Sequence, residues 1–153
     1  MRFPIKIDTI WRAPVLIGGA TNGNSYVEVT DDGVSFNYGM LFRRTVPRGE
    51  IIDAYPRQWP WWYGIGWRSD LRGVIGLVGS YQNVVEVELA KRTRAWGVFP
   101  CDRIAVSVDD PAGLIAALKA NGAKAKAATA EKPAKPKAKR KTAKRTKKAK
   151  TSD

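Results

Sequence analysis

Hydrophobic and polar residues alternate with a period of two along much of the chain. In the segment 84–89, the apolar positions Val85, Val87 and Leu89 alternate with a valine and two glutamates. Successive side chains of a strand point to opposite faces, so the segment predicts a strand with one buried face and one mostly solvated face. A Gly-Ser-Tyr-Gln-Asn turn joins it to the apolar run 74–78. We therefore expect these two runs to form a hairpin at the centre of the fold.

Turn residues divide the rest of the first hundred residues into short runs of the same kind. Asp31-Asp32-Gly33 is a tight hairpin turn, 91–94 is a basic turn, and Pro100 separates the last two runs. Turn signals about 8–12 residues apart are typical of a β-sandwich or a small barrel. The expected strands are 5–9, 25–30, 34–38, 42–46, 51–55, 64–68, 73–78, 84–89, 95–99 and 103–108.

One helix is predicted after the strands. Asp109-Asp110-Pro111 is a strong helix start, because aspartate accepts bonds from free N–H groups of the first turn and proline suits the first helical position. Leu114, Ile115 and Leu118 form an apolar stripe, and Asn121-Gly122 is a suitable C-cap. So short a helix is not stable alone in water, so it must cover an open end of the β domain.

This order of elements resembles the bacterial pleckstrin-homology-like (PH-like) domains. GIGWRSDLRGVIGLVGSYQNVVEVEL resembles their central hairpin, and SVDDPAGLIAALK resembles their last strand and capping helix. The resemblance covers roughly residues 5–120 and implies a small antiparallel barrel or sandwich that serves in binding. In the lipid-binding members a basic cluster lies on the first hairpin. Here that hairpin is acidic, so the resemblance does not extend to phosphoinositide binding.

Positive charge is concentrated at the C-terminal end of the sequence. The net charge is +13, yet residues 1–122 hold 14 basic and 12 acidic residues, a net of +2. Residues 123–153 hold 13 basic and 2 acidic residues and no aromatic, valine, isoleucine or leucine. Such a segment cannot bury enough apolar area to offset the entropy of ordering. We therefore expect a folded domain at 1–122 and a disordered basic tail at 123–153.

The Lys/Ala/Pro repeats of this tail resemble the tails of actinobacterial histone-like proteins and of eukaryotic linker histones. That resemblance implies lysines that neutralise phosphates without reading bases. An anionic membrane surface, or no dedicated partner at all, are the alternatives. The expected nucleic-acid-binding residues are Lys132, Lys135, Lys137, Lys139, Arg140, Lys141, Lys144, Arg145, Lys147, Lys148 and Lys150.

A tryptophan- and arginine-rich stretch, 57–72, offers a second possible interaction surface. Its aromatic rings could stack on bases or lie at a membrane interface, and they could equally fill the core of a small barrel. Exposed tryptophans beside the origin of the tail would favour a peripheral membrane adaptor. The residues of this surface are Arg57, Trp59, Trp61, Trp62, Arg68 and Arg72.

The sequence favours no catalytic residue, no metal site and no cofactor. It has no histidine and one cysteine, Cys101, and we expect that thiol to be inert. It contains no nucleophile elbow, P-loop or complete dinucleotide fingerprint. We therefore expect a non-enzymatic protein of the cytoplasm, with association to the nucleoid as a further expectation. The sequence does not identify a protein partner for the folded part.

Overall fold

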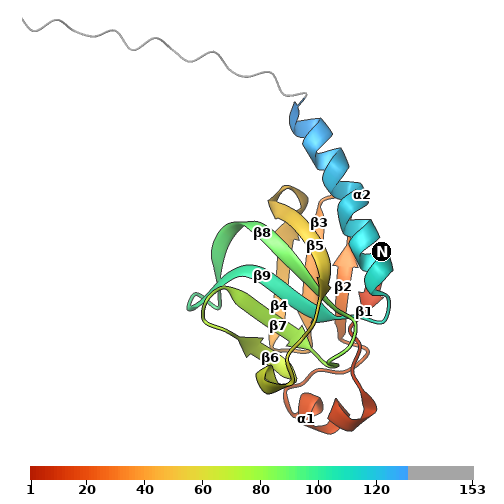
Figure 1. The fold of residues 1–153 in the computed structure, drawn as a ribbon, viewed down its shortest axis with the longest axis vertical. Coiled ribbons are helices and arrows are strands. Elements are labelled where there is room, and N and C mark those ends of the chain that lie inside the picture. The colour runs from red at the N-terminus through yellow and green to blue at the C-terminus, as the bar shows by residue number, and fades with distance from the viewer. Residues whose placement is uncertain (131–153) are drawn as a thin grey trace, which may run out of the picture.

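Two β-sheets face each other across a shared apolar core in the computed structural model, which describes residues 1–130 (Figure 1). The mostly β prediction is confirmed, and within these residues the strands do not close into a barrel. The strands are β1 (Arg2–Pro4), β2 (Ser25–Val29), β3 (Gly33–Tyr38), β4 (Phe42–Pro47), β5 (Ile51–Arg57), β6 (Gly66–Ser69), β7 (Val74–Val78), β8 (Val84–Ala95) and β9 (Phe99–Ser107). The helices are η1 (Thr9–Trp11), α1 (Arg12–Ile17), η2 (Arg48–Glu50), η3 (Trp61–Tyr63) and α2 (Pro111–Ala130).

The first sheet is an antiparallel meander in the order β1-β2-β3-β4. Val29 pairs with Val34, so β2 and β3 form the hairpin that Asp31-Asp32-Gly33 predicts. The Thr30 hydroxyl donates to the Gly33 carbonyl at 3.0 Å and fixes the turn. A β-carbon on Gly33 would lie 2.7 Å from the Val46 carbonyl, so the close approach of β4 requires glycine there.

The second sheet has the order β5-β8-β9-β7-β6, and the predicted central hairpin is therefore wrong. β9 lies between β7 and β8, antiparallel to β8 and parallel to β7. Every residue of β7 is buried, as is typical of a strand covered on both faces. Such a run shows no alternation that could indicate its partner. The order also differs from the hairpin on which the PH-like resemblance partly rests.

The β8–β9 hairpin is longer than the sequence predicts. The basic run 91–94 lies inside β8 rather than in a turn, and Pro100 lies inside β9, paired with Arg94. The turn is formed by Trp96 and Gly97, both with positive φ, of 48° and 72°. Proline is tolerated here because it is next to the start of its strand.

The N-terminal segment ties the two sheets together. Isolated bridges join Ile5 to Val108 and Ile7 to Gly79, at the ends of β9 and β7. The Ser107 hydroxyl donates to the Lys6 carbonyl and accepts from the Gly79 N–H, both at 2.9 Å. After this crossing the chain forms α1, a helix that the sequence prediction lacked.

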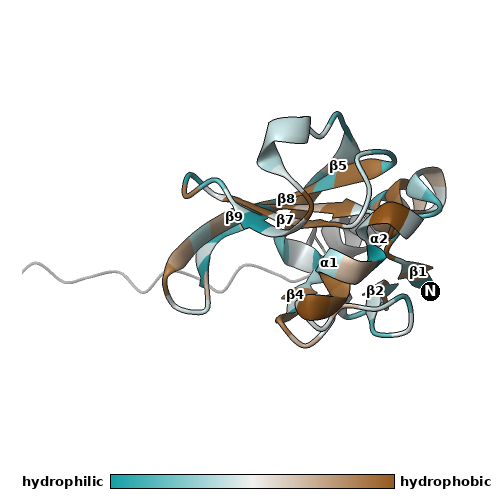
Figure 2. Cartoon of the chain, turned by 90° about the horizontal axis from the view of Figure 1, so that it is seen from below, coloured by the Kyte–Doolittle hydropathy of each residue, from teal (hydrophilic) through white to brown (hydrophobic). Residues whose placement is uncertain are grey.

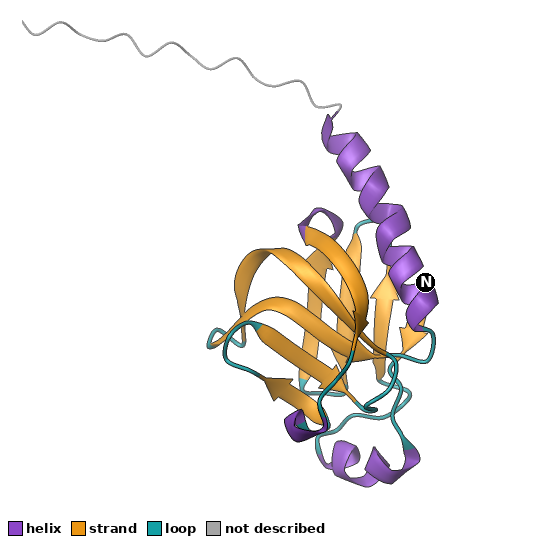
Figure 3. Ribbon diagram, in the orientation of Figure 1, coloured by secondary structure: helices purple, strands orange, loops and turns teal. Residues whose placement is uncertain are grey.

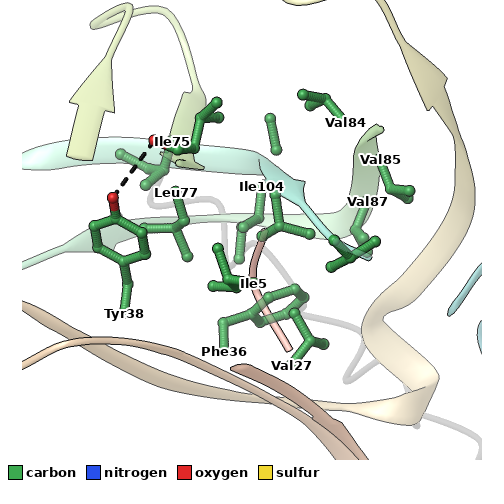
Figure 4. Packing of buried hydrophobic residues seen from close by; sticks show 14 of the residues in the cluster. Ile5, Val27, Phe36, Tyr38, Ile75, Leu77, Val84, Val85, Val87 and Ile104 are labelled. Atoms are coloured by element: carbon green, nitrogen blue, oxygen red, sulfur yellow. Dashed lines mark hydrogen bonds between the residues drawn. The ribbon is translucent and has the colours of Figure 1, made fainter. Parts of the chain in front are cut away.

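Side chains from both sheets fill the space between them. Phe36 and Tyr38 of β3 face Leu77 of β7 and Ile104 of β9, all fully buried (Figure 4). Val85, Val87 and Leu89 point inward, as the alternation predicts. Glu86 was expected on a solvated face, but it is only 2% exposed, because the loop after β5 covers that face of the sheet.

Helix α2 packs against β5, β8 and η2 (Figure 3). Leu114 and Leu118 are buried as expected, and the Asp110 carboxylate accepts from the Gly113 N–H at 2.8 Å. Arg48 of η2 donates from Nη2 to the Ala117 carbonyl at 3.2 Å and anchors the helix. The helix continues past the predicted stop at Asn121-Gly122, since the alanines and lysines that follow are strong helix formers. The expected boundary at residue 122 and the disordered tail stay predictions, and 131–153 lies outside the described residues.

Candidate nucleic-acid interface

The residues of the expected Trp/Arg surface do not lie together. Trp59 is buried over Gly76 and donates from Nε1 to the Gly64 carbonyl at 3.0 Å. Arg57 lies 5.6 Å above the Trp59 ring and forms an ion pair with Glu86. These three side chains belong to the outer covering of the second sheet. Trp59 is therefore buried, but it covers the outer face of the second sheet and does not fill the space between the two sheets.

Trp61 and Trp62 are exposed instead, by 75% and 70%, and pack edge to face with ring centroids 6.1 Å apart. They lie in η3, at the lower end of the molecule in Figure 1, whereas α2 leaves at the top. The indoles are therefore on the surface but are not beside the point where the C-terminal segment begins.

Arg68 in β6 and Arg72 in the β6–β7 turn are also exposed. Burial opposes ionisation of Asp70 in that turn, but backbone N–H groups of Val74, Arg72 and Gly73 bond its carboxylate and bring its pKa below the usual value. This bonding fixes the turn as an Asx structure. The Arg72 carbonyl accepts from Arg92 Nη2 at 2.8 Å, which links the turn to β8.

A cluster of arginines that the sequence prediction did not single out lies between β4 and the β8–β9 hairpin. Arg43, Arg44 and Arg94 line a hollow of about 190 Å³ together with Phe42 and Trp96. None of the three arginines pairs with a carboxylate of residues 1–130. We call these three arginines and Trp96 the arginine surface. The sequence signal for it was the basic run 91–94, but its partners on β4 come from tertiary packing.

Hydrogen bonds and aromatic contacts fix Arg43, Arg44 and Trp96 of the arginine surface. Arg44 donates to the Thr93 hydroxyl, and Arg43 Nε donates to the Asn37 side-chain oxygen at 3.1 Å. Trp96 packs edge to face on Phe42 and Trp67, with centroids 5.2 and 4.7 Å away. Half of Trp96 stays exposed, at 51%. A fixed indole beside guanidinium groups that have no carboxylate partner within residues 1–130 is a suitable platform for a stacked base and its phosphate.

The Glu86 carboxylate and the Cys101 thiol are both buried, and their contacts are those of structural groups. The Glu86 carboxylate accepts from the Tyr55 hydroxyl at 2.8 Å and faces Arg57 and Arg103, so its charge is already balanced. Burial raises the pKa of the Cys101 thiol, although the positive charge of Arg44 opposes the shift. A protonated, buried thiol agrees with the expected inert cysteine.

Residues 1–130 contain no cluster of three or more metal-ligating side chains. No helix in the same range is long and apolar enough to cross a membrane. The eleven expected tail residues, from Lys132 to Lys150, lie outside the described residues. Comparison with protein-family models, with curated proteins and with solved structures finds no match to this chain. The resemblance to PH-like domains therefore stays a prediction.

Proposed function

We propose that this chain is a non-enzymatic nucleic-acid-binding protein. Its lysine-rich C-terminal segment contacts the phosphate backbone without sequence preference, and its folded part, which we propose to be PH-like, mediates a further interaction. The observation that carries the proposal is the charge of residues 123–153, 13 basic against 2 acidic residues. Lysines without competing acids bind phosphates as point charges, and they present no fixed fork to a base edge.

The arginine surface supports the same proposal from the folded part. Residues 1–122 are nearly neutral at +2, yet Arg43, Arg44 and Arg94 gather at one place without carboxylate partners among the described residues. Trp96 adds a ring on which an unpaired base can stack. We therefore expect the C-terminal segment to supply most of the affinity for duplex DNA, and the arginine surface to favour single strands.

The test compares two full-length variants by fluorescence anisotropy on two unrelated duplexes over a salt series. One variant replaces Lys135, Lys139, Lys144 and Lys148 by glutamine. The matched control replaces Ala134, Ala138, Ala143 and Ala149 by glutamine and keeps every charge. If about six cations of the wild type engage, its affinity falls about a thousandfold between about 50 and 200 mM salt.

The lysine variant should bind more weakly, with a slope of log affinity on log salt reduced by up to about 0.9 for each engaged lysine removed. The alanine control should match the wild type, and both duplexes should give the same result. Unchanged affinity and slope in the lysine variant would contradict a role for the C-terminal segment. A strong preference for one duplex would contradict binding without sequence preference.

A peripheral membrane adaptor is the second candidate, and the exposure of Trp61 and Trp62 favours it. Indoles at the headgroup level and a polybasic segment near an anionic leaflet would both contribute to binding. The two features start from opposite ends of the molecule in Figure 1, which makes this candidate the weaker one. Flotation with phosphatidylglycerol and phosphatidylcholine vesicles tests it: an adaptor floats with the anionic vesicles and loses this on Trp61→Ala/Trp62→Ala.

A further inference from the structure

A cleft of about 540 Å³ opens at the end of the molecule where α1 and β6 lie. Helix α1 forms one wall with Val15, and the segment 65–67 that leads into β6 forms another. Tyr38 and Tyr81 also line the cleft. We propose that this cleft binds a small anionic amphiphile, a molecule with an apolar body and one carboxylate or similar head group, and that Arg68 holds the head. The inference is independent of nucleic-acid binding.

The lining suits an apolar body. Trp11 and Tyr81 stand edge to face with centroids 6.1 Å apart, so their rings form a stiff part of the wall. Ile65 and Val15 are buried side chains that belong to the core itself. The volume lies within the range of about 300–1,000 Å³ in which proteins hold small ligands, and such sites are mostly apolar with a few placed polar groups.

Arg68 is the only charged residue among the described residues that line the cleft. Its Nε donates to the Tyr63 carbonyl at 3.0 Å and its Nη1 to the Trp67 carbonyl at 3.2 Å, so the guanidinium is fixed by the backbone. No carboxylate of residues 1–130 pairs with it. A fixed guanidinium with free donors is well suited to a carboxylate head group.

Gly64 leaves room for this arrangement. Its φ is +74°, and a β-carbon there would lie 3.2 Å from both Nε and Nη2 of Arg68. Burial raises the pKa of Tyr38 to about 12, although Arg68 opposes the shift, so its hydroxyl stays neutral. The cleft therefore holds one positive charge and no internal anion that would compete for it.

The surface around the cleft is unusually apolar. Leu41 lines the cleft and is 47% exposed, and Leu16 and Ile17 of α1 are exposed by 58% and 91%. Figure 2, which views this end, shows α1 with a strongly hydrophobic part. Exposed apolar residues gathered at one end of a protein are typical of a binding surface. Of these residues Leu41 lines the cleft, so an apolar ligand body in the cleft would contact its side chain.

The test is isothermal titration calorimetry of the full-length protein with monomeric sodium decanoate, 1-decanol and decyltrimethylammonium. Decanoate should bind one to one, about tenfold or more tightly than decanol, since a charge-assisted hydrogen bond distinguishes them. The cation should bind most weakly. Equal affinity for the three ligands, or no saturable binding of decanoate, would overturn the proposal.

Three variants locate the site. Arg68→Ala should reduce decanoate affinity about tenfold, to the level of decanol, and leave decanol binding unchanged. Arg68→Lys, which keeps the charge, should retain the preference for decanoate. Arg72→Ala removes an exposed arginine of the neighbouring turn, outside the cleft, and should change nothing.

Leu41 lines the cleft and is partly exposed, so the larger side chain of Leu41→Trp should fill the cleft. This variant tests the proposal even if Arg68→Ala does not fold. It should abolish binding of all three ligands, whereas Ile52→Trp, at an exposed position of β5, should not. Wild-type affinity in Leu41→Trp would overturn the proposal. Binding of decanoate only as vesicles or micelles would also overturn it and would indicate insertion of the apolar surface.

Discussion

The indole of Trp59 occupies the space that a side chain at Gly76 would need. A β-carbon on Gly76 would lie 2.5 Å from the Trp59 Cη2 atom and 2.8 Å from Cζ2. The ring cannot easily retreat, because its Nε1 is bonded to the Gly64 carbonyl. The loop after β5 is thus closed over the second sheet at a position where only glycine fits.

Gly76→Ala should therefore destabilise the protein by about 1–3 kcal/mol, the usual cost of overpacking. Urea denaturation should show a lower midpoint with an unchanged m value. In a Trp59→Phe background the smaller ring makes room, so the added cost of the alanine should shrink. Gly49→Ala is the matched control, since nothing lies within 4 Å of its β-carbon position. Equal effects at the two glycines would contradict the contact.

Leu118→Ala should cost about 2–5 kcal/mol, because the side chain is only 2% exposed under α2 and its removal leaves a cavity. Thermal or urea unfolding measures the loss. Lys119→Ala, at the next residue, breaks only an exposed pair with Asp53 and should stay within about half a kcal/mol. If Leu118→Ala also cost less than about half a kcal/mol, the helix would not be docked in solution.

The double variant Arg43→Ala/Arg94→Ala should weaken binding of single-stranded DNA more than Arg12→Ala/Arg72→Ala does. Both remove two exposed arginines, so the net charge is the same and only the location differs. Trp96→Ala should weaken single-strand binding roughly tenfold and change duplex binding little, because stacking contributes about 1–3 kcal/mol per base. Anisotropy with matched single-stranded and duplex probes measures both. Equal losses for the two double variants would remove the arginine surface from the interface.

Cys101 should resist thiol reagents in the native protein. The thiol is fully buried, and burial raises its pKa, so the reactive thiolate is scarce near neutral pH. The rate of modification should rise as the pH increases toward that higher pKa, and it should rise sharply in urea. Spectrophotometric titration with a disulfide reagent follows the reaction. Rapid modification of the folded protein at neutral pH would show that the hairpin opens.

The sequence indicated where strands lie better than how they pair. Alternation placed β2 to β5 within a few residues, and Asp31-Asp32-Gly33 identified one hairpin correctly, because both signals are local. The position of β9 between β7 and β8 depends on contacts between segments that are distant in the sequence. The alternation of apolar and polar residues within one strand carries no information about those contacts. The start of α2 was predicted from a local cap, whereas its predicted stop was wrong.

The candidate site shows the same limit. Trp59 and Trp61 are two residues apart and have the same side chain, yet one is buried and the other exposed. Only the path of the loop over Gly76 decides between them. The arginine surface likewise combines β4 with β8, so counting charges along the chain could not bring Arg43 next to Arg94.

The insertion of β9 also affects synthesis on the ribosome. The first sheet is complete once β4 has emerged, since each of its strands pairs with its neighbour in sequence. β7 and β8 cannot be joined until β9 has emerged, so their edges stay open through most of translation of the second sheet. We expect nascent chains that end within β8 to recruit chaperones. In these chains the amides of β2 and β3 should be protected from hydrogen exchange before those of the second sheet. Chains that include β9 should lose the chaperone and gain protection throughout the second sheet.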